Sequence, residues 1–101
     1  MIIEYIRYDL KHHTPDALVA AYAIAAQSLQ ASPECLGFDL SACEEAPESL
    51  VLRIHWTSTH EHLQGFRKGP HFREFLAAIG PFVGEIAEMR HYRPTSVAWS
   101  R

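Results

Sequence analysis

The chain has 101 residues, of which 48% are hydrophobic and 21% are charged, and its formal net charge is −3 at pH 7. This balance predicts one globular domain, large enough to bury a core but near the size at which a partner subunit often completes it. A net negative charge provides no basic surface, so we expect no binding to nucleic acid or to a membrane. Glu4, Tyr5 and Arg7 interrupt the apolar N-terminus, which argues against a signal peptide or membrane span and favours a cytoplasmic protein.

No internal repeat or low-complexity segment divides the chain. We therefore predict a single domain over residues 1–101, with its core in residues 2–94 and a C-terminal tail of residues 95–101. Cys35 and Cys43 show neither a disulfide framework nor a CxxC spacing, so we expect two reduced thiols.

The first part of the chain predicts a strand followed by a helix. Residues 2–10 alternate with a period of two and are rich in β-branched and aromatic types, as expected for a strand. Thr14 can cap a helix whose first position is Pro15, and Ser32 before Pro33 disfavours helical geometry and ends the helix near Ala31. The expected core-facing stripe of this helix consists of Leu18, Tyr22, Ala25 and Leu29.

Two alternating segments, residues 36–43 and 50–56, are joined by a short acidic loop and predict an antiparallel hairpin. Ser58 followed by Glu61 has the spacing of a capping box, so a helix is expected to start there and to carry Leu63 and Phe66 inward.

Gly69 and Pro70 end this helix and a second helical piece begins after them. Its apolar stripe consists of Phe72, Phe75, Leu76 and Ile79. A last strand is predicted over residues 85–93, with Ile86 and Tyr92 on one side and Ala87, Met89 and His91 on the other.

The order strand, helix, strand, strand, helix, strand predicts an α+β, ferredoxin-like βαββαβ fold with both helices on one face of an antiparallel sheet. The other face would expose a row of mixed apolar and polar side chains, and large apolar patches are rare on monomers. We therefore expect a homodimer in which two copies pack sheet against sheet about a two-fold axis, a dimeric α+β barrel.

The segment from Trp56 to Leu76 resembles the signature region of the antibiotic biosynthesis monooxygenase family. The residues that carry the resemblance are Trp56, His62, Phe66, the run Gly69-Pro70-His71-Phe72, and then Phe75 and Leu76. The order of strands and helices agrees with this family over residues 2 to 94.

This resemblance implies a pocket between helices and sheet in each subunit of a dimer. It also implies oxidation of an electron-rich aromatic or quinol by O2 without flavin or metal. A subgroup of the family degrades haem by means of an asparagine, a tryptophan and an iron-binding histidine. Tyr5 or Arg7, Phe66 and Leu76 stand at these positions here, so haem degradation is disfavoured.

Such chemistry requires the substrate as its anion, a base of suitable pKa, a group that holds the anion, and an apolar enclosure. Histidine is the natural base near neutral pH. His71 lies at the start of the second helical piece, where backbone donors are free, and His62 lies one turn before Phe66 on the same helix face. These two histidines are the predicted catalytic residues; for each, the alternative is a solvated surface histidine.

The predicted substrate-binding residues are aromatic side chains that can line an apolar pocket and one cation that can hold an anion. They are Trp56, Phe66, Phe72, Phe75, Tyr22 and Arg7. For the aromatic residues the alternative is a role in the core alone, and for Arg7 or Arg53 it is an ion pair with Asp9 or Asp39.

The resemblance implies no cofactor. A metal is not expected either, because His60 and His62 point to different sides of a helix and no carboxylate or cysteine partner is evident. His55 and His91 lie on predicted strands, where a hydrogen-bonded interior histidine is the more ordinary outcome. The predicted function is a cofactor-independent monooxygenase that acts on a small aromatic or quinol substrate with O2. The alternatives are a non-catalytic dimer of the same fold that binds small molecules, and haem or metal binding through the histidines.

Overall fold

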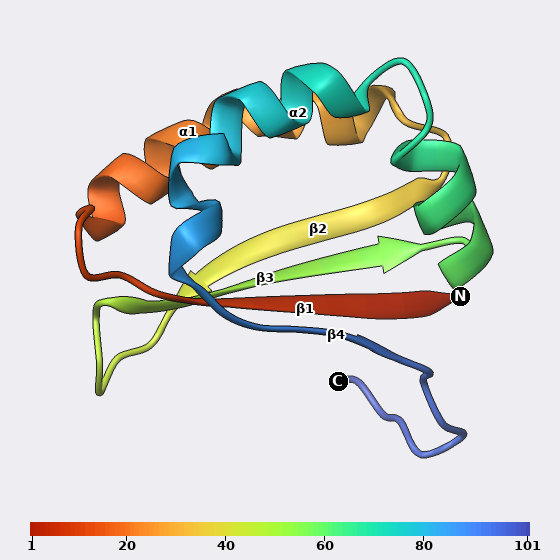
Figure 1. Cartoon of the computed structure of the whole chain (residues 1–101). Helices are drawn as coiled ribbons and strands as arrows, with labels where there is room; N and C mark the ends of the chain where they lie inside the picture. Colours follow the sequence, from red (N-terminus) through yellow and green to blue (C-terminus); the bar gives the residue numbers. More distant parts are fainter.

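The computed structural model describes residues 1–101 as one four-stranded antiparallel sheet in the order β2-β3-β1-β4. The α-helices lie on one face of the sheet. No helix covers the other face, which we call the bare face (Figure 1). None of the helices has the length and apolar character needed to cross a membrane. The predicted ferredoxin-like βαββαβ arrangement is confirmed. In chain order the elements are β1 (Ile2–Asp9), α1 (Pro15–Ala31), β2 (Cys35–Ala42), β3 (Ser49–Trp56), a π-helical turn η1 (Glu61–Phe66), α2 (Phe72–Ile79), a 3₁₀ segment η2 (Gly80–Glu85) and β4 (Ile86–Tyr92).

The start and end of α1 follow from local chemistry, as predicted. The hydroxyl of Thr14 accepts a hydrogen bond of 3.1 Å from the backbone N–H of Ala17, and Pro15 occupies the first helical turn. Ser32 closes the helix with an extended backbone immediately before Pro33. The four residues of the predicted stripe, Leu18, Tyr22, Ala25 and Leu29, are all buried.

Alternation along β1 and β3 separates the two faces of the sheet. Ile6 and Tyr8 of β1 pair with Leu52 and Leu50 of β3, and these side chains are buried under the helices. Tyr5 pairs with Arg53 on the opposite, bare face. Residues directly opposite in an antiparallel pair share a face, so one register decides the orientation of every side chain.

A bulge changes the prediction for β4. Arg7 pairs with Glu88 and Tyr8 pairs with Ile86, which leaves Ala87 as the extra residue. Because the extra residue reverses the alternation, Met89 and His91 share the helix-covered face with Ile86, as the partners of Ile6 and Glu4. Tyr92 pairs with Ile3 and lies on the bare face. The expectation that Ile86 and Tyr92 share one side is therefore wrong.

The segment after β3 is helical, but its first piece is a wide π-turn. The backbone N–H of Glu61 donates to the Ser58 hydroxyl at 3.0 Å, which is one of the two hydrogen bonds of a capping box. The N–H of Arg67 donates to the carbonyl of His62 at 3.1 Å, a bond five residues apart that widens the turn. His62 and Phe66 are the buried residues of this turn. Leu63 is only half-buried, so the expectation that it points inward with Phe66 is wrong.

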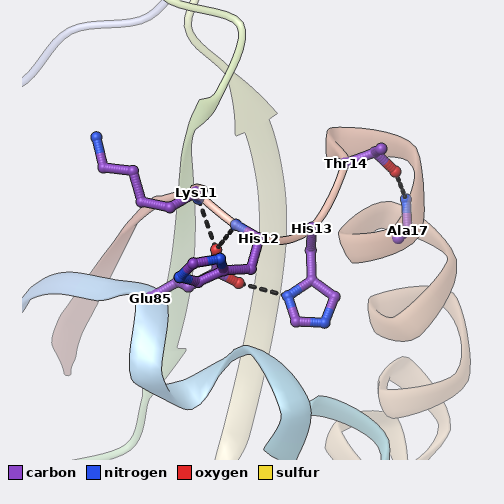
Figure 2. A network of polar contacts seen from close by, with 6 residues as sticks. All are labelled: Lys11, His12, His13, Thr14, Ala17 and Glu85. Carbon is purple, nitrogen blue, oxygen red and sulfur yellow. Dashed lines mark hydrogen bonds and ion pairs between the residues drawn. The ribbon is translucent and has the colours of Figure 1, made fainter.

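Glu85, at the end of η2, hydrogen-bonds to the loop between β1 and α1 and so joins two segments that are far apart in the sequence (Figure 2). One carboxylate oxygen accepts hydrogen bonds of 2.6 Å from the backbone N–H groups of both Lys11 and His12. The other oxygen lies 2.5 Å from Nδ1 of His13. This carboxylate satisfies backbone donors that the loop itself cannot pair, and it thereby positions the start of α1.

Candidate functional site

A cavity of about 230 Å³ lies between the sheet and the helical layer. Its walls come from β1, β3, β4, η1, α2, η2 and one residue of α1, so the broken helix and the 3₁₀ segment close the space over the sheet. Most of the lining side chains are apolar or aromatic. They are Ile6, Tyr8, Tyr22, Ile54, Trp56, Phe66, Phe72, Phe75, Leu76, Ile79, Val83, Ile86 and Met89, together with the polar residues Glu4, His62 and Arg67.

Glu4 and Trp56 form the polar end of the cavity on adjacent strands. The indole N–H of Trp56 donates to Oε1 of Glu4 at 3.0 Å. Both side chains are excluded from solvent, with 1% and 0% of the residue exposed. A carboxyl group in such a place is costly unless it is paired, so its surroundings determine its chemistry.

His62 of η1 covers this end of the cavity. Its ring stacks on the Trp56 indole with ring centres 4.5 Å apart and an interplanar angle of 11°. Its Nε2 lies 3.5 Å from Oε1 of Glu4, and its Nδ1 lies 2.8 Å from Nε2 of His91 on β4. Imidazole nitrogens of two histidines and one carboxylate therefore lie within 4.8 Å of one another.

One atom of this group is unsatisfied. Oε2 of Glu4 is buried and has no hydrogen-bond partner, and Nε2 of His91 lies 4.0 Å from it. Buried polar atoms are almost always paired, so an orphaned carboxylate oxygen facing imidazoles indicates a place for a bound proton, hydroxyl group or cation.

Burial determines the protonation of the pair. Desolvation raises the pKa of Glu4, although the hydrogen bond from Trp56 and the charges of His91 and Arg67 oppose the shift. Desolvation lowers the pKa of His62 to about 4, and the positive charges of Arg67 and His91 act in the same direction. The neutral imidazole of His62 is thus a free base at neutral pH.

A second polar feature of the cavity is a pair of phenols. The hydroxyls of Tyr8 on β1 and Tyr22 on α1 lie 2.5 Å apart, and both residues are buried. Burial raises the pKa of both hydroxyls, so they stay neutral and can exchange hydrogen bonds with a polar group of a ligand.

Aromatic rings form the wall between these two polar features. Phe66 packs edge to face on Phe72 and on Phe75, with ring centres 5.6 and 5.3 Å apart. Phe75 in turn contacts Tyr22 in the same geometry at 6.2 Å. Such a wall suits a flat aromatic ligand, because edge-to-face and stacked contacts are the preferred arrangements of rings.

The structure brings six of the eight predicted site residues together around the cavity. They are His62, Trp56, Phe66, Phe72, Phe75 and Tyr22. His71 is placed elsewhere: it precedes α2 as its N-cap residue and lines a separate hollow beside Glu34, Gly65 and Pro70. Arg7 is exposed on the bare face of the sheet, opposite Val51 and Glu88. Neither residue lines the cavity: His71 follows the Gly69-Pro70 break at the start of α2, and the register of β1 points Arg7 away from the helices.

Sequence reasoning missed Glu4 and left His91 without a role. Glu4 belongs to the same alternating set of β1 as Ile6 and Tyr8. A carboxylate on an otherwise apolar strand face could have indicated a buried polar site. His91 could not be assigned because the bulge at Ala87 decides its face.

Comparison with known proteins agrees with this fold. Residues 1–78 match the family described as antibiotic biosynthesis monooxygenase. The Bacillus subtilis protein YczJ, which is uncharacterised, is 22% identical over 93 residues, which are 92% of this chain and 98% of YczJ.

Solved structures show the same fold at low identity. A Bordetella bronchiseptica protein assigned to this family superimposes with a TM-score of 0.78 at 23% identity, over 93% of this chain and 96% of the other. A variant of SnoaB from Streptomyces nogalater, a cofactor-independent oxygenase, gives 0.77 at 16% identity, over 95% of this chain and 94% of SnoaB. Because the family match covers most of the chain, the protein belongs to the antibiotic biosynthesis monooxygenase family.

Proposed function

We propose that this chain is a monooxygenase that oxidises a small aromatic, quinol-type substrate with O2, with electrons passing from the substrate itself and not from a flavin or haem. The observation that carries the proposal is the cavity: an aromatic enclosure with one polar end at Glu4 and His62. The family membership and the similarity in fold to a cofactor-independent oxygenase support the same reading.

The geometry suits the steps that such an oxidation needs. A quinol hydroxyl at the polar end lies beside the unpaired Oε2 of Glu4 and the ring of His62, which together accept its proton. The quinol anion then gives electrons to O2; one oxygen atom forms a C–O bond to the ring and the other leaves as water. A quinol and O2 thus give a hydroxyquinone and water, with no external reductant.

The aromatic wall and the exclusion of water complete the site. Trp56, Phe66 and Phe75 are buried, so a ring held among them is shielded from solvent at the polar end of the cavity. In that environment a hydrogen bond from Tyr8 or Tyr22 to a second substrate oxygen counts for more than it would in water.

Oxygen uptake with a panel of hydroquinones tests the proposal. Wild-type protein should consume O2 above the autoxidation background, and with ¹⁸O₂ the hydroxyquinone should carry one labelled oxygen. His62→Ala and Glu4→Gln should lower the rate by about 100-fold or more, the contribution expected of a positioned proton acceptor. His60→Ala, at an exposed histidine next to the same turn, is the matched control and should keep the wild-type rate.

Two results would contradict the proposal. Wild-type uptake equal to background, with ligand binding intact, would support the alternative of a non-catalytic binding protein. A loss of rate in His71→Ala with no loss in His62→Ala would mean that the chemistry takes place outside this cavity.

We further propose that the bare face of the sheet is the interface of a two-fold homodimer. Ile3, Tyr5, Val51 and Tyr92 give this face an apolar centre, and Tyr5 and Tyr92 pack edge to face at 5.2 Å. The tail after β4 turns back on the same side of the sheet (Figure 1) and exposes 88% of Val97 and 77% of Trp99. Exposed apolar area of this kind is typical of an interface.

A further inference from the structure

We infer that Glu4, His62 and His91 form a binding site for one divalent transition-metal ion at the polar end of the cavity. The three side chains come from β1, η1 and β4, so only the folded chain assembles them. Two imidazoles and one carboxylate are a donor set that suits Zn²⁺, Fe²⁺ or Co²⁺ better than Mg²⁺ or Ca²⁺, which prefer oxygen alone.

The distances are close to those of a ligand set. Donor atoms at about 2.1 Å from one ion lie roughly 3 to 4 Å apart, depending on the angle between them. Nδ1 of His62 and Nε2 of His91 are 2.8 Å apart, and Nε2 of His91 is 4.0 Å from Oε2 of Glu4. The 2.8 Å contact is a hydrogen bond between the two imidazoles, so an ion would replace its proton and draw together donor atoms that already lie within 4.8 Å of one another.

The unpaired carboxylate oxygen is the independent observation that points to a ligand. Glu4 is 1% exposed, its Oε1 is held by the Trp56 N–H, and its Oε2 has no partner. The hydrogen bond from Trp56 holds Oε1, which also lies 3.5 Å from Nε2 of His62, and leaves Oε2 4.0 Å from Nε2 of His91. Partners of this kind orient metal ligands in known sites.

The position of the group leaves room for further ligands. Glu4 and His62 line the cavity and His91 does not, so the three donors meet at the edge of the cavity, where a further ligand could reach the ion from the cavity side. A site with three protein ligands and open positions is the arrangement of catalytic metal centres.

Metal binding is tested on the full chain without any organic substrate. Protein stripped with a chelator is dialysed to equilibrium against Zn²⁺ or Co²⁺, and the bound metal and the visible absorption of Co²⁺ are measured. We expect saturable binding of one ion per chain and a Co²⁺ spectrum of low coordination number. Metal should also raise Tm, because it binds the folded state alone.

Variants locate the site. Loss of a residue that only supports a metal ligand lowers metal affinity by about 10- to 100-fold. His91→Ala and the isosteric Glu4→Gln remove ligands themselves, so they should lower the affinity further. They should also abolish the rise in Tm. His60→Ala and His12→Ala remove exposed histidines and should bind as wild type does. Glu4→Gln keeps the shape of the core, so it reports on the site even if His91→Ala proves unstable.

Absence of saturable binding to wild type, or an equal loss in the exposed-histidine variants, would overturn the inference. Its failure is distinct from failure of the proposed oxygenase, since no turnover enters the measurement. Conversely, a chain that binds the ion stoichiometrically and consumes no O2, metal-loaded or stripped, would overturn the oxygenase proposal and leave the metal site standing.

Discussion

Glu85 and Glu4 are both buried carboxylates, yet their surroundings shift their pKa values in opposite directions. Hydrogen bonds from the backbone of His12, from the His13 ring and from the backbone of Lys11 lower the pKa of Glu85 to about 2. Glu4 has one donor, the Trp56 indole, and burial raises its pKa. The number of fixed donors thus separates a structural carboxylate from one that is available for chemistry.

Glu85 should contribute stability that depends on pH. Because its folded pKa of about 2 is below the ordinary 4.5, the contribution is present above pH 4.5 and is lost as pH falls toward 2. Glu85→Gln should lower the free energy of unfolding at neutral pH and flatten its decline over that acid range. Urea denaturation at several pH values measures both effects.

Glu74→Gln, on the exposed side of α2, is the matched control for the loss of one carboxyl charge. If the Glu85 and Glu74 variants show the same pH dependence of unfolding, the network drawn in Figure 2 does not stabilise the fold in this way.

Among the elements, the broken helix between β3 and η2 does most to shape the cavity. The π-turn η1 brings His62 and Phe66 onto one buried face, and α2 adds Phe75 and Ile79 from a new direction. Gly69 lies between the two pieces, with its N–H donating to the carbonyl of Phe66 at 3.0 Å. A straight helix would not close over the sheet in this way.

Gly69 is required by a close approach of two backbone segments. A Cβ at this position would lie 2.4 Å from the carbonyl oxygen of Gly65, and a backbone atom cannot move aside cheaply. Gly69→Ala should therefore destabilise the fold by about 1–3 kcal/mol, as overpacking does, and weaken ligand binding in the cavity. Gly84→Ala adds a Cβ that meets nothing within 4 Å and serves as the control in urea denaturation. Equal stability of the two variants would contradict the steric argument.

At the scale of the whole molecule, the two faces of the sheet have different roles. The helix-covered face contains the core and the cavity. The bare face combines the apolar side chains of Ile3, Tyr5 and Val51 with charged groups, including an Arg53–Asp39 ion pair of 2.6 Å. A mixed face of this kind can pack on a copy of itself, because the Arg53–Asp39 pair is satisfied within each subunit and the apolar side chains remain free to make contact.

Sedimentation at micromolar concentration tests the proposed dimer. Wild type should sediment as a dimer, and Val51→Lys should shift it toward monomer because a second positive charge would be placed in the interface opposite Arg7. Ile24→Glu changes a side chain that is 64% exposed on α1 and should leave the dimer intact. A monomeric wild type would refute the interface.

The order and type of the elements could be predicted from local patterns, because caps and alternation act over only a few residues. Thr14, Pro15 and Ser32 determine α1, and the period of two identifies the strands. The aromatic lining could be predicted as well, since Trp56, Phe66 and Phe75 lie in apolar patterns that face the core, and all three are buried.

What the sequence alone determined is thus the βαββαβ order, the family resemblance and most of the cavity wall. Only the tertiary structure decided which polar groups meet there. The bulge at Ala87 turns His91 inward, the π-turn buries His62 and leaves His71 outside, and the strand register places Glu4 beneath both imidazoles. These are contacts between distant segments, set by packing and by a one-residue shift in register, and no local pattern contains them.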